Sequence, residues 1–219
     1  MALAPEHFKK RSRPRCRPDD AGEASVRERI LSAAFAAFME RGYSGASTLE
    51  IATRAKVSKR ELYALVGSKQ DMLVACIAAR SARMRLAPAE RPAVRDRDSL
   101  TRVLQALGGR LLGEVSHPTV IATFRLAIAE ATQAPEVARV LEAQARRPNR
   151  AALEEILEEE CAAAVLRGEA AEIAERFVAL LWGDLLLALL LRTAERPGPS
   201  ELKRRAADAV TALLRLYGQ

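Results

Sequence analysis

Residues 47–69, STLEIATRAKVSKRELYALVGSK, are the stretch that decides the fold. Three serines in it, Ser47, Ser58 and Ser68, are each followed three residues later by an acid. In such a capping box the serine hydroxyl accepts from a first-turn N–H, and the acid binds the N–H of the serine. Each serine therefore predicts a helix start. Because Ser47 and Ser58 lie so close, the helix between them has only about two turns, which predicts a helix-turn-helix.

Working outward from this stretch, the sequence divides into three parts. A fourth box, Ser25 with Glu28, predicts a helix over 26–41 that ends at Gly42, where glycine accepts the left-handed conformation. Helices over 48–55, 59–65 and 69–85 follow. Basic, proline-containing residues precede this group, and two prolines with alternating charges follow it. We expect a disordered arm over 1–23, a DNA-binding domain over 24–86 and an effector-binding and dimerisation domain over 87–219.

The composition favours helix throughout. Aromatic residues make up 4% of the 219 residues, and no segment has the alternating pattern of a strand. Apolar periodicity and prolines predict further helices over 99–115, 118–132, 135–146, 149–167, 170–195 and 200–217. The fold class is therefore all-α, with an N-terminal three-helix domain containing the helix-turn-helix and a C-terminal helical bundle.

The positive charge is concentrated at one end of the chain. Residues 1–86 hold 17 Lys or Arg against 9 Asp or Glu, whereas residues 87–219 hold 18 against 19. This asymmetry indicates an anionic partner, either nucleic acid or a membrane surface, although a solvated basic face is also compatible with it. The alternative function is thus a basic protein- or membrane-surface interaction module without sequence-specific DNA binding.

Other classes of protein find little support. The apolar run 178–191 is interrupted by Asp184 and is shorter than the ~20 residues of a membrane span, and no apolar segment near the N-terminus predicts a signal peptide. Three widely spaced cysteines fit a cytoplasmic setting. With two histidines, no glycine-rich phosphate loop and no metal-ligand spacing, we expect no enzyme, no cofactor and no metal.

The helix starts carry residues suited to DNA. Lys59, Arg60 and Lys69 lie in first turns, where positive charge opposes the helix dipole, which suggests pairing with phosphate. Ser47, Thr48 and Ser58 would bring hydroxyl and backbone N–H groups to phosphates. Arg60 can bind guanine O6 and N7. Glu61 has two interpretations, as the acid of a capping box or as an acceptor for cytosine N4. Tyr63 can bind phosphate through its hydroxyl or pack in the domain core.

The spacing of these residues resembles a known family. Residues 30–43 read ILSAAFAAFMERGY, and with residues 47–73 they are similar to the N-terminal domain of tetracycline-repressor-family regulators. The resemblance implies phosphate contacts from Thr48, Tyr63 and Lys69, and base contacts from Lys59 and Arg60. Three positions depart from the family. Lys56 replaces the usual turn glycine, Arg60 and Glu61 replace Gly-Thr, and Leu65 replaces a histidine.

The resemblance also implies a homodimer that binds an operator in double-stranded DNA and a small-molecule effector in its C-terminal domain. The segment 170–195 is apolar on more than one face, which predicts a dimer interface built from the last two helices, although a core helix would show the same pattern. We expect a palindromic operator and an apolar effector. Candidate effector contacts are the polar or aromatic members of apolar helices: Phe124, Arg125, Gln144, Trp182 and Asp184.

Overall fold

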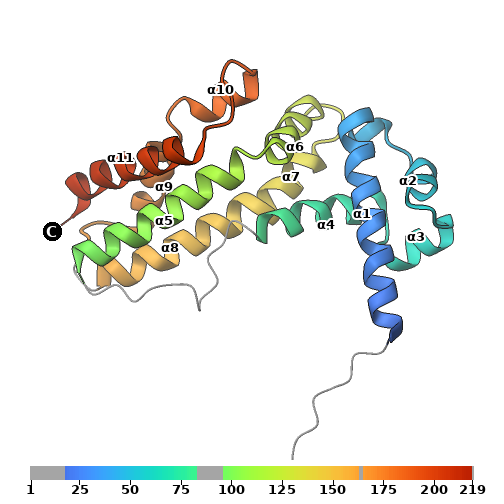
Figure 1. Ribbon diagram of the computed structural model, residues 1–219, viewed down its shortest axis with the longest axis horizontal. Coiled ribbons are helices and arrows are strands. Elements are labelled where there is room, and N and C mark those ends of the chain that lie inside the picture. The colour runs from blue at the N-terminus through green and yellow to red at the C-terminus, as the bar shows by residue number, and fades with distance from the viewer. Residues whose placement is uncertain (1–17, 83–95, 163–164, 219) are drawn as a thin grey trace, which may run out of the picture.

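The protein is all-helical over the residues described by the computed structural model, which are 18–82, 96–162 and 165–218. The first four helices, α1 (Pro18–Gly45), α2 (Thr48–Ala55), α3 (Lys59–Leu65) and α4 (Lys69–Ser81), form one end of an elongated molecule (Figure 1). The body comprises α5 (Arg97–Val115), α6 (Pro118–Ala129), α7 (Glu136–Leu141), η3 (Glu142–Arg146), α8 (Arg147–Ala162), α9 (Ala170–Trp182), α10 (Leu185–Leu191) and α11 (Pro199–Tyr217). The predicted fold class is confirmed.

Three of the four predicted serine caps are present. The hydroxyls of Ser47, Ser58 and Ser68 accept from backbone N–H groups three residues on, at 3.1, 3.1 and 3.2 Å. The prediction for Ser25 is wrong, because α1 already begins at Pro18 and Ser25 lies inside it. Residues 18–23 of the predicted arm are therefore helical, and residues 1–17 lie outside the described residues.

Two turns contain a residue with positive φ. Lys56 ends α2 in the left-handed conformation, with φ 56° and ψ 46°, although it is not glycine. Gly42 has φ 76° and interrupts the helical run of α1. The structure adds a second reason for glycine there, because a Cβ at this position would lie 2.5 Å from Oε1 of Glu130.

Two predicted helix boundaries in the body are wrong. The helices expected over 135–146 and 149–167 run on from one to the next, because the π-helical η3 leads directly into α8. Pro148 lacks an N–H and its ring crowds the preceding turn, and a local π-turn accommodates such a residue without ending the helix. Conversely, the helix expected over 170–195 is divided at Gly183, whose φ 47° and ψ −125° are not helical.

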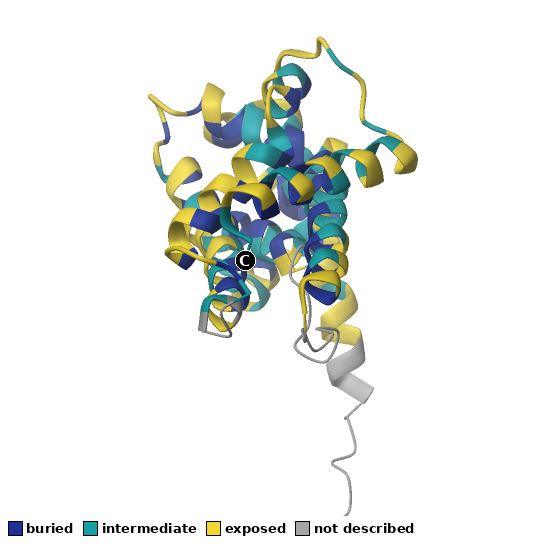
Figure 2. Cartoon of the chain, turned by 90° about the vertical axis from the view of Figure 1, so that its left-hand side faces the viewer, coloured by how far each residue is buried: buried dark blue, intermediate teal, exposed yellow. Residues whose placement is uncertain are grey.

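The hydrophobic core has two parts. Figure 2 shows that the buried residues gather on the inward-facing sides of the helices. One cluster joins residues of α1 to α4, such as Phe38, Ile51 and Leu62, to residues of α6, α7 and η3, such as Leu126 and Val137. The other cluster joins α5, α8, α9, α10 and α11. The predicted boundary at 86/87 lies outside the described residues. The first four helices therefore share their core with the near side of the body.

Candidate functional site

The residues predicted to contact DNA from α2 and α3 share one surface. The Thr48 Oγ1 atom lies 3.3 Å from the Tyr63 hydroxyl oxygen, and the Lys59 Nζ atom lies 6.0 Å from the centre of the Tyr63 ring. Tyr63 is 45% exposed, so the alternative that it packs in the domain core is not what the structure shows. The other predicted contacts on these two helices are also exposed: Ser47, Ser58, Lys59 and Arg60.

This surface is held by buried apolar side chains behind it and by an exposed ion pair. Ile51 of α2 and Leu62 of α3 are fully buried in the shared core. The Arg54 Nη2 atom lies 2.6 Å from a carboxylate oxygen of Glu40 and 2.6 Å from one of Glu50, which ties α2 to α1. Since α3 buries one side chain fully, most of its polar side chains face solvent and are available to a ligand.

The Glu61 carboxylate is freer to bind a ligand than the capping interpretation suggests. The Ser58 hydroxyl accepts from the Glu61 N–H, but the full reciprocal box is present only at Ser68 and Asp96 among the described helix starts. The Glu61 side chain is exposed at the start of α3, next to Arg60. Its carboxylate is therefore placed on the candidate DNA surface rather than on the serine N–H.

Lys69 points away from that surface. Its Nζ atom donates to the carbonyl oxygens of Tyr43 at 2.9 Å and Ala46 at 3.3 Å, and it reaches that of Ser44 at 3.5 Å. It also lies 4.6 Å from the centre of the Tyr43 ring, within the range of a cation–π contact. The ammonium group therefore fastens the end of α1 and the residue that follows it, and the predicted phosphate contact from Lys69 stays a prediction.

A carboxylate from the body meets the same segment. Glu130 ends α6, is 9% exposed, and accepts from the Ser44 hydroxyl at 2.5 Å and from the Ser44 N–H at 3.1 Å. These bonds, helped by the positive charge of Lys69, lower the pKa of Glu130 although burial acts in the opposite direction. Sequence reasoning missed this joint, because the two residues are 86 positions apart and no local pattern marks either.

The five predicted effector contacts do not converge on one cavity. Phe124 packs against the core shared with α1 to α4, Gln144 lies in η3, and Trp182 packs against the other core cluster. Arg125 donates to the carbonyl oxygens of Leu189 and Leu190, at 2.6 and 2.9 Å, and thereby holds the end of α10. Asp184 is exposed before α10 and forms no side-chain cap there. These effector contacts stay predictions.

The part of the chain that the structure describes gives little indication of metal binding, thiol chemistry or membrane insertion. No group of three or more His, Cys, Asp or Glu residues there could hold a metal ion. Burial raises the pKa of the Cys76 thiol to about 12, which keeps the thiol protonated and unreactive at neutral pH. No single described helix is long and apolar enough to cross a membrane. The bent pair of α3 and α4 meets that test together, by length and composition only.

Family models match both parts of the chain. Residues 30–76 match the bacterial regulatory proteins of the tetR family, and residues 102–219 match the C-terminal domain of AefR-like transcriptional repressors. No curated protein gives a significant match to the sequence.

Solved structures share the fold over most of the chain. A putative TetR-family regulator from Mesorhizobium loti is 23% identical, with a TM-score of 0.75 over 90% of this chain and 98% of its own. The flavonoid-responsive regulator FrrA is 24% identical, with a TM-score of 0.73 over 89% of this chain and 98% of its own. A TetR regulator from Agrobacterium tumefaciens is 26% identical, with a TM-score of 0.71 over 88% and 95%.

The sequence matches, the shared fold and the exposed polar surface of α2 and α3 agree. They support a DNA-binding repressor with a ligand-binding C-terminal domain, and they offer no support for the alternative of a basic interaction module. Proteins of this kind are generally transcription factors rather than enzymes. The chain belongs to the TetR family of transcriptional regulators, and its C-terminal domain is of the AefR-like repressor type.

Proposed function

We propose that this repressor binds a palindromic operator as a homodimer and is released by a small, largely apolar effector. The observation that carries the proposal is the single exposed surface formed by the start of α2 and by α3. On it the Thr48 and Tyr63 hydroxyl oxygens lie 3.3 Å apart, beside Lys59 and Arg60. Such a surface has both the hydroxyl donors and the cations that a DNA backbone requires.

Within this proposal the residues have distinct roles. Arg60 is the base-reading residue, because a guanidinium can bind guanine O6 and N7 together in the major groove. Lys59, Tyr63 and Thr48 bind phosphates and fix the register of α3. The backbone N–H groups at the start of α2, beside Ser47, add to the same contacts.

The dimer is supported by apolar side chains left exposed on α9 and α10. In this region Phe177, Leu181, Leu185 and Leu189 are buried inside the subunit. The opposite side remains open, with Val178 36%, Leu187 54% and Leu191 63% exposed. A second subunit would cover this face. In a two-fold dimer that binds successive half-sites, the two copies of α3 lie about 34–36 Å apart, one turn of DNA.

The small effector is supported by the family and by fold relatives. FrrA is a flavonoid-responsive regulator, and FadR from Bacillus subtilis, 13% identical, was solved in complex with stearoyl-CoA. An effector acts by binding the DNA-free conformation more tightly than the DNA-bound one, so it lowers operator affinity.

The test of DNA recognition is a gel-shift scan across the upstream region of the protein's own gene, at near-physiological salt with competitor DNA. We expect selective retention of a fragment that contains an inverted repeat. If competitor DNA abolished the binding of every fragment although the protein was dimeric, the proposal would be contradicted. Binding of that kind is non-specific and is a salt-dependent property of any basic surface.

The dimer is tested with a matched pair of substitutions. Leu191→Asp places a charge on the proposed interface, whereas Ile128→Asp makes a similar change at a side chain that is also 63% exposed but lies on α6. In light scattering, we expect a monomer for Leu191→Asp and a dimer for Ile128→Asp. If both variants were dimers, or both were monomers, the proposal that α10 forms the interface would be contradicted.

A further inference from the structure

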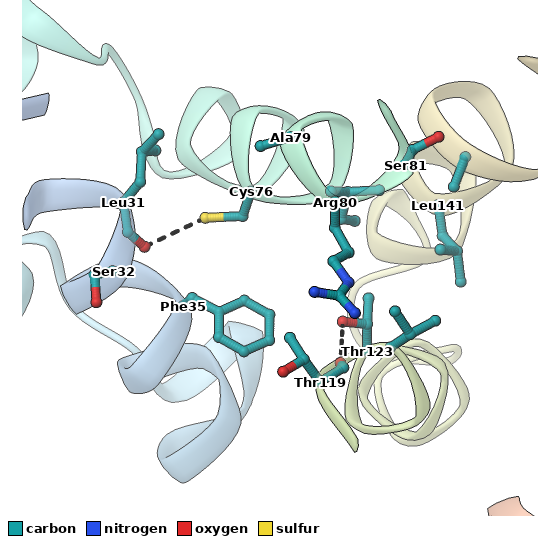
Figure 3. Close-up of a pocket in the computed structure, with 13 residues that line it drawn as sticks. Leu31, Ser32, Phe35, Cys76, Ala79, Arg80, Ser81, Thr119, Thr123 and Leu141 are labelled. Atoms are coloured by element: carbon teal, nitrogen blue, oxygen red, sulfur yellow. Dashed lines mark hydrogen bonds between the residues drawn. The ribbon is translucent and has the colours of Figure 1, made fainter. Parts of the chain in front are cut away.

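A cavity of about 300 Å³ lies at the seam between the first four helices and the body. Leu31 and Phe35 of α1 form one wall, Cys76 and Arg80 of α4 another, and Thr123 of α6 and Leu141 of α7 the remainder (Figure 3). None of the five effector contacts predicted from sequence lines this cavity. The cavity belongs to the shared core rather than to the C-terminal domain alone, since α1 and α4 contribute eight of its thirteen lining residues.

The polar groups around the cavity are mostly occupied by the protein itself. The Thr123 hydroxyl donates to the Thr119 carbonyl oxygen at 2.9 Å, and the Cys76 thiol to the Leu31 carbonyl oxygen at 3.4 Å. Arg80 is paired with Glu114 of α5 at 3.0 Å, so its charge is already neutralised. The buried Nε atom of Arg80 and the buried Oε2 atom of Glu114, however, each lack a hydrogen-bond partner among the described residues.

These features define the chemical class of the occupant. An apolar lining favours a molecule with an apolar body, and the neutral Arg80–Glu114 pair gives an anion no net attraction. An unsatisfied Nε is favourable to a ligand that brings one hydrogen-bond acceptor, such as a carbonyl oxygen. The volume lies at the lower end of the usual range for ligand pockets, which excludes a bulky ligand.

We infer that this seam cavity is the effector site, and that its ligand is a small, neutral, mainly apolar molecule with one hydrogen-bond acceptor. The inference rests on the proposed function, because release from DNA is its consequence. A ligand here touches α1 and α4, which position α2 and α3, and also touches α6, whose end holds Ser44 through Glu130. Occupancy therefore biases the DNA-binding end directly, without a relay through the far core.

The first experiment titrates the full chain with prodan, a neutral aminonaphthalene ketone whose emission shifts to the blue in apolar surroundings. We expect saturable binding at one dye per chain. Ser32→Phe, at an exposed cavity-lining position of α1, should weaken binding at least about tenfold, because the new ring occupies the cavity. The matched control is Ser25→Phe, two turns earlier on α1, exposed and outside the lining, which should change binding less than about twofold.

Competition then tests the class of ligand. A neutral naphthyl methyl ketone should displace prodan at lower concentration than naphthoate, which has nearly the same shape but a negative charge. Equal weakening by both phenylalanine variants would place the dye elsewhere and overturn the site, as would the absence of saturable binding. Stronger displacement by naphthoate would overturn the neutral class.

A gel shift with the selected operator fragment separates this inference from the proposed function. Saturating prodan should lower the operator affinity of the wild-type protein. The operator affinity of Ser32→Phe should be the same with and without the dye. An operator complex that forms normally but ignores bound prodan overturns the effector site while DNA recognition stands. Failure of any fragment to bind selectively overturns the proposed DNA recognition, whereas the dye titration still decides whether the cavity binds its ligand.

Discussion

The starts of α3 and α4 carry the same two residues, Ser-Lys, and use the lysine in opposite ways. Lys59 is exposed beside Tyr63 on the candidate DNA surface. Lys69 turns inward and donates to carbonyl oxygens at the end of α1 and just after it. A lysine that opposes the helix dipole must be compensated elsewhere. For α3 the compensating group would be a ligand outside the protein, whereas for α4 it is a set of carbonyl oxygens within the protein. A basic helix start therefore does not by itself identify a DNA contact.

The largest effect expected from this difference is on stability. Lys69→Met removes the donor to the Tyr43 and Ala46 carbonyl groups and the cation over the Tyr43 ring, and we expect the free energy of unfolding to fall by about 3 kcal/mol. Lys59→Met is the matched control, and its effect should be within about 0.5 kcal/mol, as for most surface substitutions. Urea unfolding measures both. Equal stability losses would show that the two lysines are equivalent after all.

The α3 start should instead control sequence preference. Arg60→Ala should reduce the discrimination between the operator and a fragment with a changed guanine by about 2 kcal/mol, because the bidentate contact is lost. Arg215→Ala, which truncates an exposed arginine of α11, is the control and should leave discrimination unchanged. Quantitative gel shifts at one salt concentration measure the ratio of affinities. A uniform loss on both fragments would instead make Arg60 a phosphate contact.

The internal joint also predicts a pH dependence. The pKa of Glu130 is lowered in the folded protein, chiefly by the Ser44 hydroxyl. Its stabilising contribution is therefore present above the ordinary pKa of a glutamate and is lost as the pH falls through the lowered value. Glu130→Gln, which keeps the shape, should reduce stability by about 1.5 kcal/mol at neutral pH.

The pH series tests this contribution against the other carboxylates. Stability of the wild type and of Glu130→Gln should converge as the pH falls through the lowered pKa that Glu130 has in the folded protein, because below it both side chains are uncharged. Denaturant unfolding at neutral pH and at successively more acidic values gives the difference. A gap between the two proteins that stays constant with pH would exclude the Glu130 charge as the source of the joint's stability.

How far the sequence predicted the structure depends on the distance over which residues interact. Ser47, Ser58 and Ser68 cap helices through bonds to residues three positions on, so their spacing alone reveals them. The bonds of Lys69 to Tyr43 and of Glu130 to Ser44 span 26 and 86 positions, and local spacing contains no trace of them. The helix starts that carry the candidate DNA surface were therefore predictable, whereas these two long-range contacts were not.

The seam cavity was not predictable for the same reason. Its lining comes from α1, α4, α6 and the α7–η3 run, whose mutual placement depends on the packing of the shared core. Two polar residues of apolar helices, Arg125 and Asp184, are outside this lining: Arg125 holds the end of α10, and Asp184 is exposed. Polarity within an apolar helix does not distinguish a structural bond from a ligand contact.

The smallest expected effect concerns the turn between α2 and α3. Lys56 adopts φ 56°, where a side chain costs about 1–2 kcal/mol, while its N–H still bonds to the Ala52 and Thr53 carbonyl groups. Lys56→Gly removes that cost but adds freedom to the unfolded chain, so we expect a net gain of about 0.5–1 kcal/mol. Lys56→Ala keeps the Cβ and should change the free energy of unfolding by less than about 0.5 kcal/mol. Thermal unfolding of the two variants separates the cost of the left-handed backbone from the effect of the lysine side chain. A gain for alanine as large as that for glycine would assign the cost to the charge of Lys56, beside the basic start of α3, rather than to the left-handed turn.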